Sequence, residues 1–280
     1  MKKTTLGKAN LDENRSGQLT RSFAVIRALA QGNDDARRVI DIARSVGLPE
    51  STTHRILGGL IAEGVVEQCR KTRGYRLSVE FFSLGTMARE PYTHDGFIGD
   101  VLESLCADLG DSTFFLVRRG FDAICMDMCE GPVPVRSYTG RIGGRMPLGT
   151  GEGGLAILAF LPEAEREEII RANWAIRQEH SEIADDEQTL RARIHLAQKL
   201  GYVTRDRGII DAMTGVSVPI LDRLGSAVAA LSVGALAQRF QAGRLELVVQ
   251  RLKLAADAIA PSVDRYRMRI PNPYMANATA

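Results

Sequence analysis

The fold of the amino-terminal part is decided by the stretch Pro49–Ser78, which reads PESTTHRILGGLIAEGVVEQCRKTRGYRLS. Its first half predicts a helix, because the residues that would face a core recur at steps of three and four. Those residues are Thr53, Ile56, Leu57, Leu60 and Ile61. Proline suits the first turn of a helix, whose N–H groups have no partner within the helix. Gly64 then ends the helix at about residue 63.

A hairpin with a basic tip follows this helix. Two strand-like runs, 65–69 and 75–78, are joined by Arg70-Lys71-Thr72-Arg73-Gly74, in which three of the five residues are basic. Two further helices are predicted upstream, one from Ser22 to Gly32 and one over 37–46. Three helices and a basic-tipped hairpin form the winged helix-turn-helix arrangement. Residues before 19 are polar and lack apolar periodicity, so we predict a flexible arm over 1–18.

The outer face of the third helix is available to a partner, because its polar residues are not needed for packing. Such a face usually meets only solvent, but the charge distribution favours a polyanion. Residues 1–90 hold 15 Lys+Arg against 10 Asp+Glu, a net charge of +5, whereas the rest of the chain carries −3. We therefore predict that the helix enters the major groove of DNA and that the hairpin contacts phosphates. The candidate DNA-binding residues are Ser51, Thr52, His54 and Arg55 on the helix, and Arg70, Lys71 and Arg73 on the hairpin.

The rest of the chain predicts an α+β domain, in which an antiparallel sheet is flanked by helices. The predicted helices cover 97–109, 153–161, 163–172, 186–200 and 240–266, and the predicted strands cover 113–117, 123–129, 133–138, 213–221 and 227–234. A linker helix over 79–89 precedes this domain. The predicted boundaries are 19–78 for the winged helix-turn-helix, 79–94 for the linker helix and connection, 95–268 for the α+β domain and 269–280 for a tail.

The run Gly149-Thr150-Gly151-Glu152-Gly153-Gly154 matches G-x-G-x-x-G. It is not a dinucleotide-binding fingerprint, because residues 142–147 before it are poor strand material and the acidic residues about 20 positions later lie within a predicted helix. Two interpretations remain open. The N–H groups of the helix that follows can hold an anion, or the glycines can let that helix pack closely on the sheet. Similarly, Ser217 and Ser232 lie in apolar strand runs and face either solvent or a polar ligand.

Composition excludes several classes of protein. The 280 residues carry a net charge of +2 and are 45% hydrophobic, which is typical of a globular protein. No apolar run approaches the ~20 residues of a membrane-spanning helix, and the amino terminus lacks the apolar stretch of a signal peptide. We therefore expect a cytoplasmic protein with no membrane partner. The four cysteines form no C-x-x-C pair and the histidines do not cluster near them, so we expect no metal site and no cofactor.

The sequence also lacks catalytic signatures such as G-x-S-x-G, H-E-x-x-H and the P-loop. We therefore predict no catalytic residues and no enzyme. One alternative is a small-acid hydrolase that uses Arg205 and Asp206, although it lacks a recognisable nucleophile–base pair and leaves the basic hairpin unexplained. Another is a membrane- or RNA-associated adaptor, for which no aromatic or basic amphipathic stretch is present. The acidic residues Asp185 and Asp186 are interpreted as a loop and N-cap before the helix over 186–200.

Two segments resemble the IclR family of bacterial transcription regulators, and the resemblance covers about residues 19–265. Asp41–Leu57 looks like the helix-turn-helix of the family, and Met146–Pro162 looks like the start of its effector pocket. The order of wing, linker helix and sensor domain also agrees. The resemblance implies a repressor or activator of a catabolic operon, with a GAF-like domain that binds a small organic or aromatic acid. It further implies homodimers or tetramers bound to double-stranded promoter DNA.

By this resemblance the effector-binding residues are Met146, Leu148, Gly151, Gly153, Gly154, Arg205, Asp206, Ser217 and Ser232. The chain departs from the family at Gly149, where members usually have histidine, at Gly153-Gly154, where they have Gly-Lys, and at Arg205-Asp206-Arg207-Gly208, where many have acidic residues. Gly215 and Gly234 also replace side chains that are often found in the pocket. Smaller residues leave more room, and an arginine can pair with a carboxylate through two hydrogen bonds. We therefore predict an anionic effector bulkier than a two- or three-carbon acid, with aromatic or cyclic acids favoured.

Overall fold

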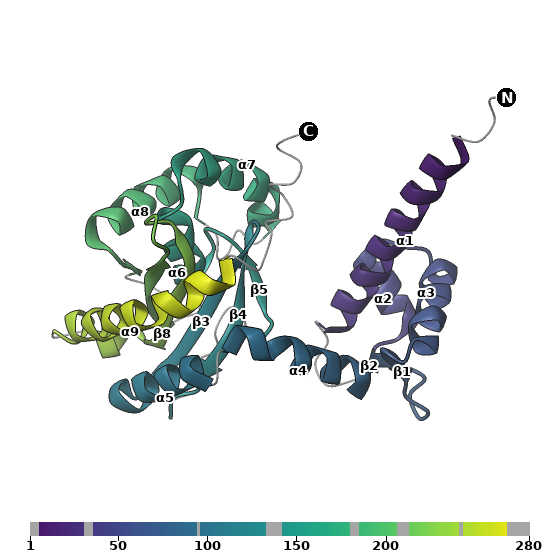
Figure 1. Cartoon of the computed structure of the whole chain (residues 1–280), viewed down its shortest axis with the longest axis horizontal. Coiled ribbons are helices and arrows are strands. Elements are labelled where there is room, and N and C mark those ends of the chain that lie inside the picture. The colour runs from purple at the N-terminus through teal and green to yellow at the C-terminus, as the bar shows by residue number, and fades with distance from the viewer. Residues whose placement is uncertain are drawn as a thin grey trace. The chain divides into compact units, whose positions relative to one another are not determined.

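The computed structural model describes residues 6–30, 36–93, 96–132, 142–179, 185–205, 213–240 and 243–267. The chain divides into two compact units, Met1–Glu90 and Pro91–Ala280 (Figure 1). The first unit contains a helix-turn-helix with a hairpin, and the second contains an antiparallel sheet covered by helices. The predicted α+β fold class is confirmed.

The first unit includes three helices and a two-stranded hairpin that share one core. They are α1 (Leu6–Ala30), α2 (Val39–Val46), α3 (Glu50–Ala62), β1 (Val66–Gln68) and β2 (Tyr75–Leu77). Their shared core includes Val25 of α1, Ile42 of α2 and Leu57 of α3. Gly47 ends α2 with a φ of 65°, in the left-handed region that favours glycine, and Pro49 directly precedes α3. The short turn between these helices is therefore built as the sequence predicts.

The first helix begins much earlier than we predicted. The flexible arm over 1–18 is wrong from Leu6 onward, because α1 starts there; residues 1–5 lie outside the described residues. The core residues that α1 contributes, Val25, Ala28 and Leu29, lie in its last two turns. Apolar periodicity reports which part of a helix packs against a core, and no proline interrupts the residues upstream. The pattern therefore located the packed part of the helix and missed the rest.

The hairpin is attached to the helices by a close backbone contact. The N–H groups of Arg37 and Tyr75 each donate to the other residue's carbonyl oxygen, at 2.9 and 2.8 Å. This contact brings Gly74 so near to Ala36 that a Cβ at position 74 would lie 2.5 Å from the Ala36 carbonyl oxygen. Only glycine fits such an approach without a shift of the backbone. The α4 helix (Val79–Thr93) follows the hairpin, where the linker helix is predicted.

The second unit is built on a six-stranded antiparallel sheet. Its strands are β3 (Ser112–Arg119), β4 (Asp122–Cys129), β5 (Arg145–Pro147), β6 (Val203–Thr204), β7 (Met213–Leu221) and β8 (Ala227–Leu236). They lie in the order β5-β4-β3-β8-β7-β6. The helical elements of this unit are α5 (Phe97–Leu109), α6 (Gly151–Ala159), α7 (Glu163–Glu179), α8 (Glu187–Leu200), the 3-10 helix η2 (Ala237–Phe240) and α9 (Arg244–Arg267).

Alternation along the strands separates two cores, one on each face of the sheet. Phe114 and Leu116 of β3 pack with α6, α7 and α8, whereas Phe115 between them packs with α5 and α9. In Figure 1, α5 lies below the strands and α7 and α8 lie above them. The loop from β5 into α6 therefore belongs to the layer of α6, α7 and α8.

Two short strands at the sheet edges were missed. Residues 142–147 are called poor strand material above, yet β5 pairs with β4, and Pro147 lies opposite Asp122. An edge strand tolerates proline because one side of its backbone needs no ladder partner. At the other edge, β6 has only two residues, too few to give a pattern. The strand predicted over 133–138 and the tail over 269–280 lie outside the described residues.

Candidate functional site

The α3 helix has one buried face and one polar outer face. Its buried residues are Thr53, Ile56 and Leu57. On the outer face, Ser51, His54 and Arg55 are exposed and Thr52 is half-buried. The Thr53 hydroxyl donates to the carbonyl of Pro49 at 3.1 Å, so this polar residue is satisfied within the helix. The outward residues lie as the sequence predicts, but the predicted core face is only partly confirmed. Leu60 is half-buried, and Ile61, which was also predicted to face the core, is 39% exposed.

The tip of the hairpin holds three cations in solvent. Arg70, Lys71 and Arg73 are all exposed, and within the described part of the chain no carboxylate pairs with their side chains. Arg73 has a φ of 58°, which is uncommon for a residue with a side chain. The amide of Gln68 donates to the carbonyl of Arg73 at 2.9 Å and holds this turn. Unpaired cations on a short hairpin have the chemistry needed to contact phosphates.

In the second unit, the glycine-rich loop leads into the amino terminus of α6. Thr150 occupies the N-cap position, but its side chain makes no capping hydrogen bond, and its buried Oγ1 has no hydrogen-bond partner. The N–H of Gly149 donates to the carbonyl of Gly154 at 3.2 Å, which closes the loop on the first turn of α6. Met146 and Leu148 of the same loop are buried. The start of α6 therefore offers N–H groups and a free hydroxyl, which suit an anion.

The glycines of this loop also lie against other side chains. A Cβ at position 153 would come within 2.8 Å of Leu116 Cδ1 and 3.0 Å of Ser232 Oγ, and one at Gly149 within 2.9 Å of Leu158 Cδ2. The glycines thus allow α6 to pack closely, which is one of the two interpretations above. The prediction that Gly149 leaves room for a bulky effector is wrong, because the Leu158 side chain already fills that space.

Two buried serines lie opposite each other beside this loop. Ser217 of β7 and Ser232 of β8 are register partners, and their Oγ atoms are 2.6 Å apart. Both are buried, so they do not face solvent. Two hydroxyls that bond to each other use one hydrogen and leave the second for another acceptor. The pair can therefore still donate one hydrogen bond to a ligand.

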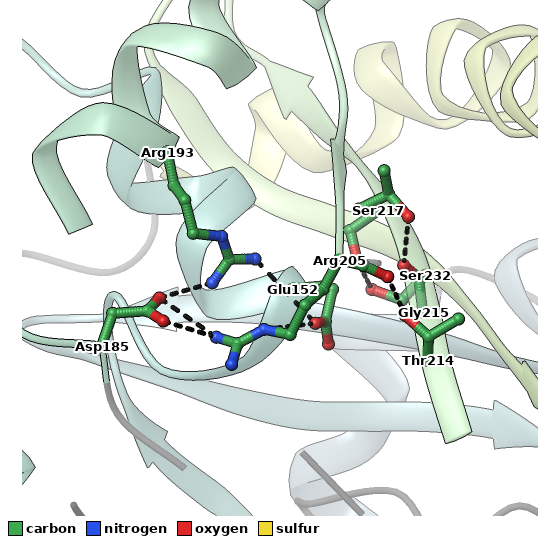
Figure 2. Close-up of polar contacts among 9 residues, drawn as sticks. Glu152, Asp185, Arg193, Arg205, Thr214, Gly215, Ser217 and Ser232 are labelled. Carbon is green, nitrogen blue, oxygen red and sulfur yellow. Dashed lines mark hydrogen bonds and ion pairs between the residues drawn. The ribbon is translucent and has the colours of Figure 1, made fainter. Parts of the chain in front are cut away.

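Four charged side chains from four segments meet next to α6 (Figure 2). The Asp185 carboxylate accepts hydrogen bonds from Arg193 at 2.5 Å and from Arg205 at 3.0 and 3.1 Å. The Glu152 carboxylate lies 3.6 Å from Arg205 Nε and 3.9 Å from Arg193 Nη2, too far for a hydrogen bond. Accordingly, Glu152 Oε1, Arg193 Nη2 and Arg205 Nε are buried without hydrogen-bond partners. Arg205, which we expected to face the effector's carboxylate, is already paired with Asp185.

A third arginine lies beside this cluster without a carboxylate of its own. Arg177 of α7 is only 1% exposed. Its Nη2 donates to the backbone carbonyl of Asp185 at 2.8 Å, and its guanidinium carbon is 5.8 Å from the centre of the Trp174 ring. Its Nε and Nη1 have no hydrogen-bond partner. Burial lowers the pKa of this guanidinium, and the nearby negative charges of Asp185 and Glu187 oppose that shift.

The structure gathers most of the predicted effector residues around the start of α6, but not all can be placed. Gly153 lies against Ser232, and Asp206 lies outside the described residues. Asp186 is the N-cap of α8, as predicted, because its carboxylate accepts from the N–H of Thr189 at 2.8 Å. The charged residues that the sequence analysis did not single out for this site are Glu152, Arg177, Asp185 and Arg193.

The described residues contain no group of three or more His, Cys, Asp or Glu side chains placed to hold a metal ion. None of the described helices is both long and apolar enough to cross a membrane.

Family models match both units of the chain. The IclR helix-turn-helix domain matches residues 18–70, and the bacterial transcriptional regulator IclR C-terminal domain matches residues 98–261. The chain belongs to the IclR family of bacterial transcriptional regulators. It therefore combines a helix-turn-helix domain with a carboxy-terminal effector-binding domain, as the resemblance implied.

Relatives of this IclR-family chain cover nearly its whole length. The transcriptional regulator KipR of Bacillus subtilis is 24% identical over 90% of this chain and 98% of its own. The transcriptional repressor AllR of Escherichia coli is 26% identical over 81% of this chain and 82% of its own. Both relatives are transcriptional regulators.

Solved structures of the family share the fold. A regulator from Alicyclobacillus acidocaldarius is 20% identical and has a TM-score of 0.73, over 88% of this chain and 98% of its own. An IclR homologue from Microbacterium hydrocarbonoxydans, solved in complex with 4-hydroxybenzoate, is 25% identical with a TM-score of 0.69 over the same shares.

Proposed function

We propose that this IclR-family regulator binds promoter DNA through the outer face of α3 and the basic hairpin tip. The observation that carries the proposal is the absence of intramolecular partners for the cations there. Within the described residues, no ion pair involves the side chains of Arg55, Arg70, Lys71 or Arg73. On this proposal, Ser51, Thr52, His54 and Arg55 lie near base edges or adjacent phosphates, and the hairpin cations contact the backbone.

The proposed effector is an organic acid, with aromatic acids favoured. Three observations support this class: the free N–H groups and hydroxyl at the start of α6, the buried arginines beside it, and the 4-hydroxybenzoate held by the Microbacterium homologue. The proposed site comprises the loop at 146–154, Arg205, Asp206, Ser217 and Ser232. A preference for bulk no longer follows from Gly149, and the ligand of the homologue supports it.

The proposed assembly is a homodimer, or a pair of homodimers, in the cytoplasm. Support comes from α4, on which Val79, Phe82 and Met87 are each more than 70% exposed. Residues spaced by three and by eight positions share one side of a helix, so these side chains form an apolar stripe. Monomeric proteins seldom expose such stripes, and a second copy of α4 would cover it.

We do not propose the hydrolase alternative. Arg205 pairs with Asp185, and Ser217 pairs with Ser232 rather than with a base. The histidines whose side chains are described, His54 and His195, are both exposed. Neither Ser217 nor Ser232 is therefore hydrogen-bonded to a histidine that could act as its base.

Fluorescence anisotropy with the DNA upstream of the protein's own gene tests the proposed function. We expect binding at low ionic strength that weakens with salt, and a change in affinity when 4-hydroxybenzoate is added. A scrambled duplex of equal length reports the sequence-independent part. Failure to bind any promoter fragment at low salt would refute the DNA-binding proposal, whereas binding that no organic acid alters would refute only the effector class.

A further inference from the structure

The arginines nearest to α6 already have their charges balanced. Arg193 and Arg205 share the carboxylate of Asp185, and Glu152 lies within 4 Å of both. A carboxylate that approached Arg205 would have to displace Asp185 or lie against the negative charge of Glu152. Like charges at such distances oppose each other strongly in a buried site. Arg205 is therefore a poor partner for an anionic effector.

Arg177 is in a different state from these two arginines. A guanidinium has five N–H donors, and the one hydrogen bond that Arg177 makes is donated by Nη2. Its Nε and Nη1, which carry three N–H groups between them, have no hydrogen-bond partner among the residues that the structure describes. The Asp185 carboxylate oxygens nearby accept from Arg193 and Arg205 instead. Buried polar groups are nearly always hydrogen-bonded, so three unpaired donors on one buried side chain point to a missing acceptor.

On the side of the glycine-rich loop, the surroundings of Arg177 are apolar. A Cβ built on Gly149 would lie 3.9 Å from the guanidinium carbon, next to Leu158 and Leu190. The Trp174 ring covers the guanidinium from another side. A cation in such surroundings is costly unless an anion accompanies it. The same loop leads into α6, so an anion held here would also lie near the start of that helix.

The charge balance of the whole cluster agrees with this conclusion. Among the buried members of the cluster, Arg177, Arg193 and Arg205 carry three positive charges, and Glu152 and Asp185 carry two negative ones, which leaves a net charge of +1 on the buried group. Glu187, whose charge also acts on Arg177, is exposed and pairs with Arg191. A single carboxylate would make this buried group neutral. A ligand with two negative charges would leave the buried group with a net charge of −1.

We infer that Arg177 binds the carboxylate of the effector and selects monocarboxylates over uncharged and doubly charged analogues. The inference rests on the proposed function, since it assumes an acidic effector. It assigns the recognition of the anion to α7 and the Gly149 loop, and it leaves Arg205 to hold Asp185 in place. Asp185 connects Arg177 to the pair of Arg193 and Arg205, because its backbone carbonyl accepts the one hydrogen bond that Arg177 makes.

The test compares a carboxylate with its neutral counterpart of the same shape. Calorimetry on the full-length protein measures the affinities for 4-hydroxybenzoate and 4-hydroxybenzamide. We expect the wild type to prefer the acid at least tenfold. In Arg177→Met the ratio should fall below three, mainly through weaker binding of the acid, while the affinity for the amide changes less than threefold. Arg171→Met is the matched control, because Arg171 is exposed on the same helix. The ratio of acid affinity to amide affinity in this variant should equal that of the wild type.

Several outcomes overturn the inference. It is wrong if Arg177→Met keeps a tenfold preference for the acid, or if the wild type binds acid and amide equally. Should the methionine variant fail to fold, Arg177→Lys decides, because lysine keeps the charge but not the planar donors. An affinity for the acid within twofold of wild type would then overturn the inference. A wild type that binds DNA but neither probe refutes the acidic effector and this inference together, while the DNA-binding proposal stands.

Discussion

Replacing Asp185 by asparagine should destabilise the second unit strongly. Asparagine keeps the shape of the side chain but removes its charge, so Arg193 and Arg205 lose their hydrogen-bonded anion. Breaking a buried ion pair costs about 3–5 kcal/mol. The Asp185 side chain is 9% exposed, but those of the arginines are 15% and 21% exposed and Glu152 stays within 4 Å, so we expect about 2–4 kcal/mol. At about 2–4 °C per kcal/mol for a unit of this size, the melting temperature should fall by about 4–16 °C.

Asp186→Asn is the matched control for this change. Asp186 is exposed and caps α8, and asparagine is as good an N-cap as aspartate, so the loss should stay below about 0.5 kcal/mol. Urea denaturation followed by the fluorescence of Trp174, the single tryptophan of the chain, reports on the unit that contains α7 and α8. If Asp185→Asn loses no more stability than Asp186→Asn, the cluster is screened by solvent and the reasoning about its buried charges fails.

Three further predictions concern single side chains. Lys71→Ala should weaken binding to specific and scrambled duplexes alike and lower the slope of log affinity against log salt by about one; an unchanged slope removes Lys71 from the interface. Gly74→Ala should destabilise the first unit by about 1–3 kcal/mol in thermal denaturation, because its methyl group would clash with the carbonyl of Ala36; wild-type stability would show that the hairpin can shift. Hydrogen bonds from Arg191 lower the pKa of Glu167, so this carboxylate contributes stability above about pH 4.3 that is lost as the pH falls through its folded pKa. Glu167→Gln should therefore cost about 0.2–1 kcal/mol at pH 7, as expected for a partly exposed pair, and progressively less as the pH falls below about 4.3; a cost that does not decrease in acid would assign the effect to something other than ionisation.

The first unit was largely predictable because its signals are local. The helical spacing of Thr53, Ile56 and Leu57, the proline before them and the glycine that ends the preceding helix all act within a few residues. The same locality explains the error at α1. A helix that extends beyond its packing partners carries no apolar pattern, and only the tendency of each residue to form helix remains as a signal.

The second unit shows where local signals end. Its longer strands and helices follow from alternation and helical spacing, but β5 and β6 are held as edge strands by pairing with distant residues. The charged cluster is less predictable still. Its members, Glu152, Arg177, Asp185, Arg193 and Arg205, come from three helices and two connecting segments, and each resembles an ordinary surface residue in its own segment. Only the packing of α7 and α8 over the start of α6 turns them into a buried group.

The buried cluster links effector binding to stability and thereby limits how the protein can respond. In the ligand-free form, the Nε and Nη1 donors of the buried Arg177 have no acceptor among the described residues. An anion that accepts from them stabilises the second unit by mass action, by about 2.7 kcal/mol at one hundred times its dissociation constant. Stabilisation alone does not change DNA affinity, because a ligand acts on DNA binding only if it prefers one of two arrangements of the protein.

Asp185 is the residue at which such a preference would arise. Its backbone accepts from Arg177 while its carboxylate holds Arg193 and Arg205, so a carboxylate drawn to Arg177 alters the field around the segment that leads into α8. Recognition of the anion and movement of that segment would then be one event. The change in DNA affinity would depend on how much more tightly the anion binds one arrangement of the Asp185 segment than the other.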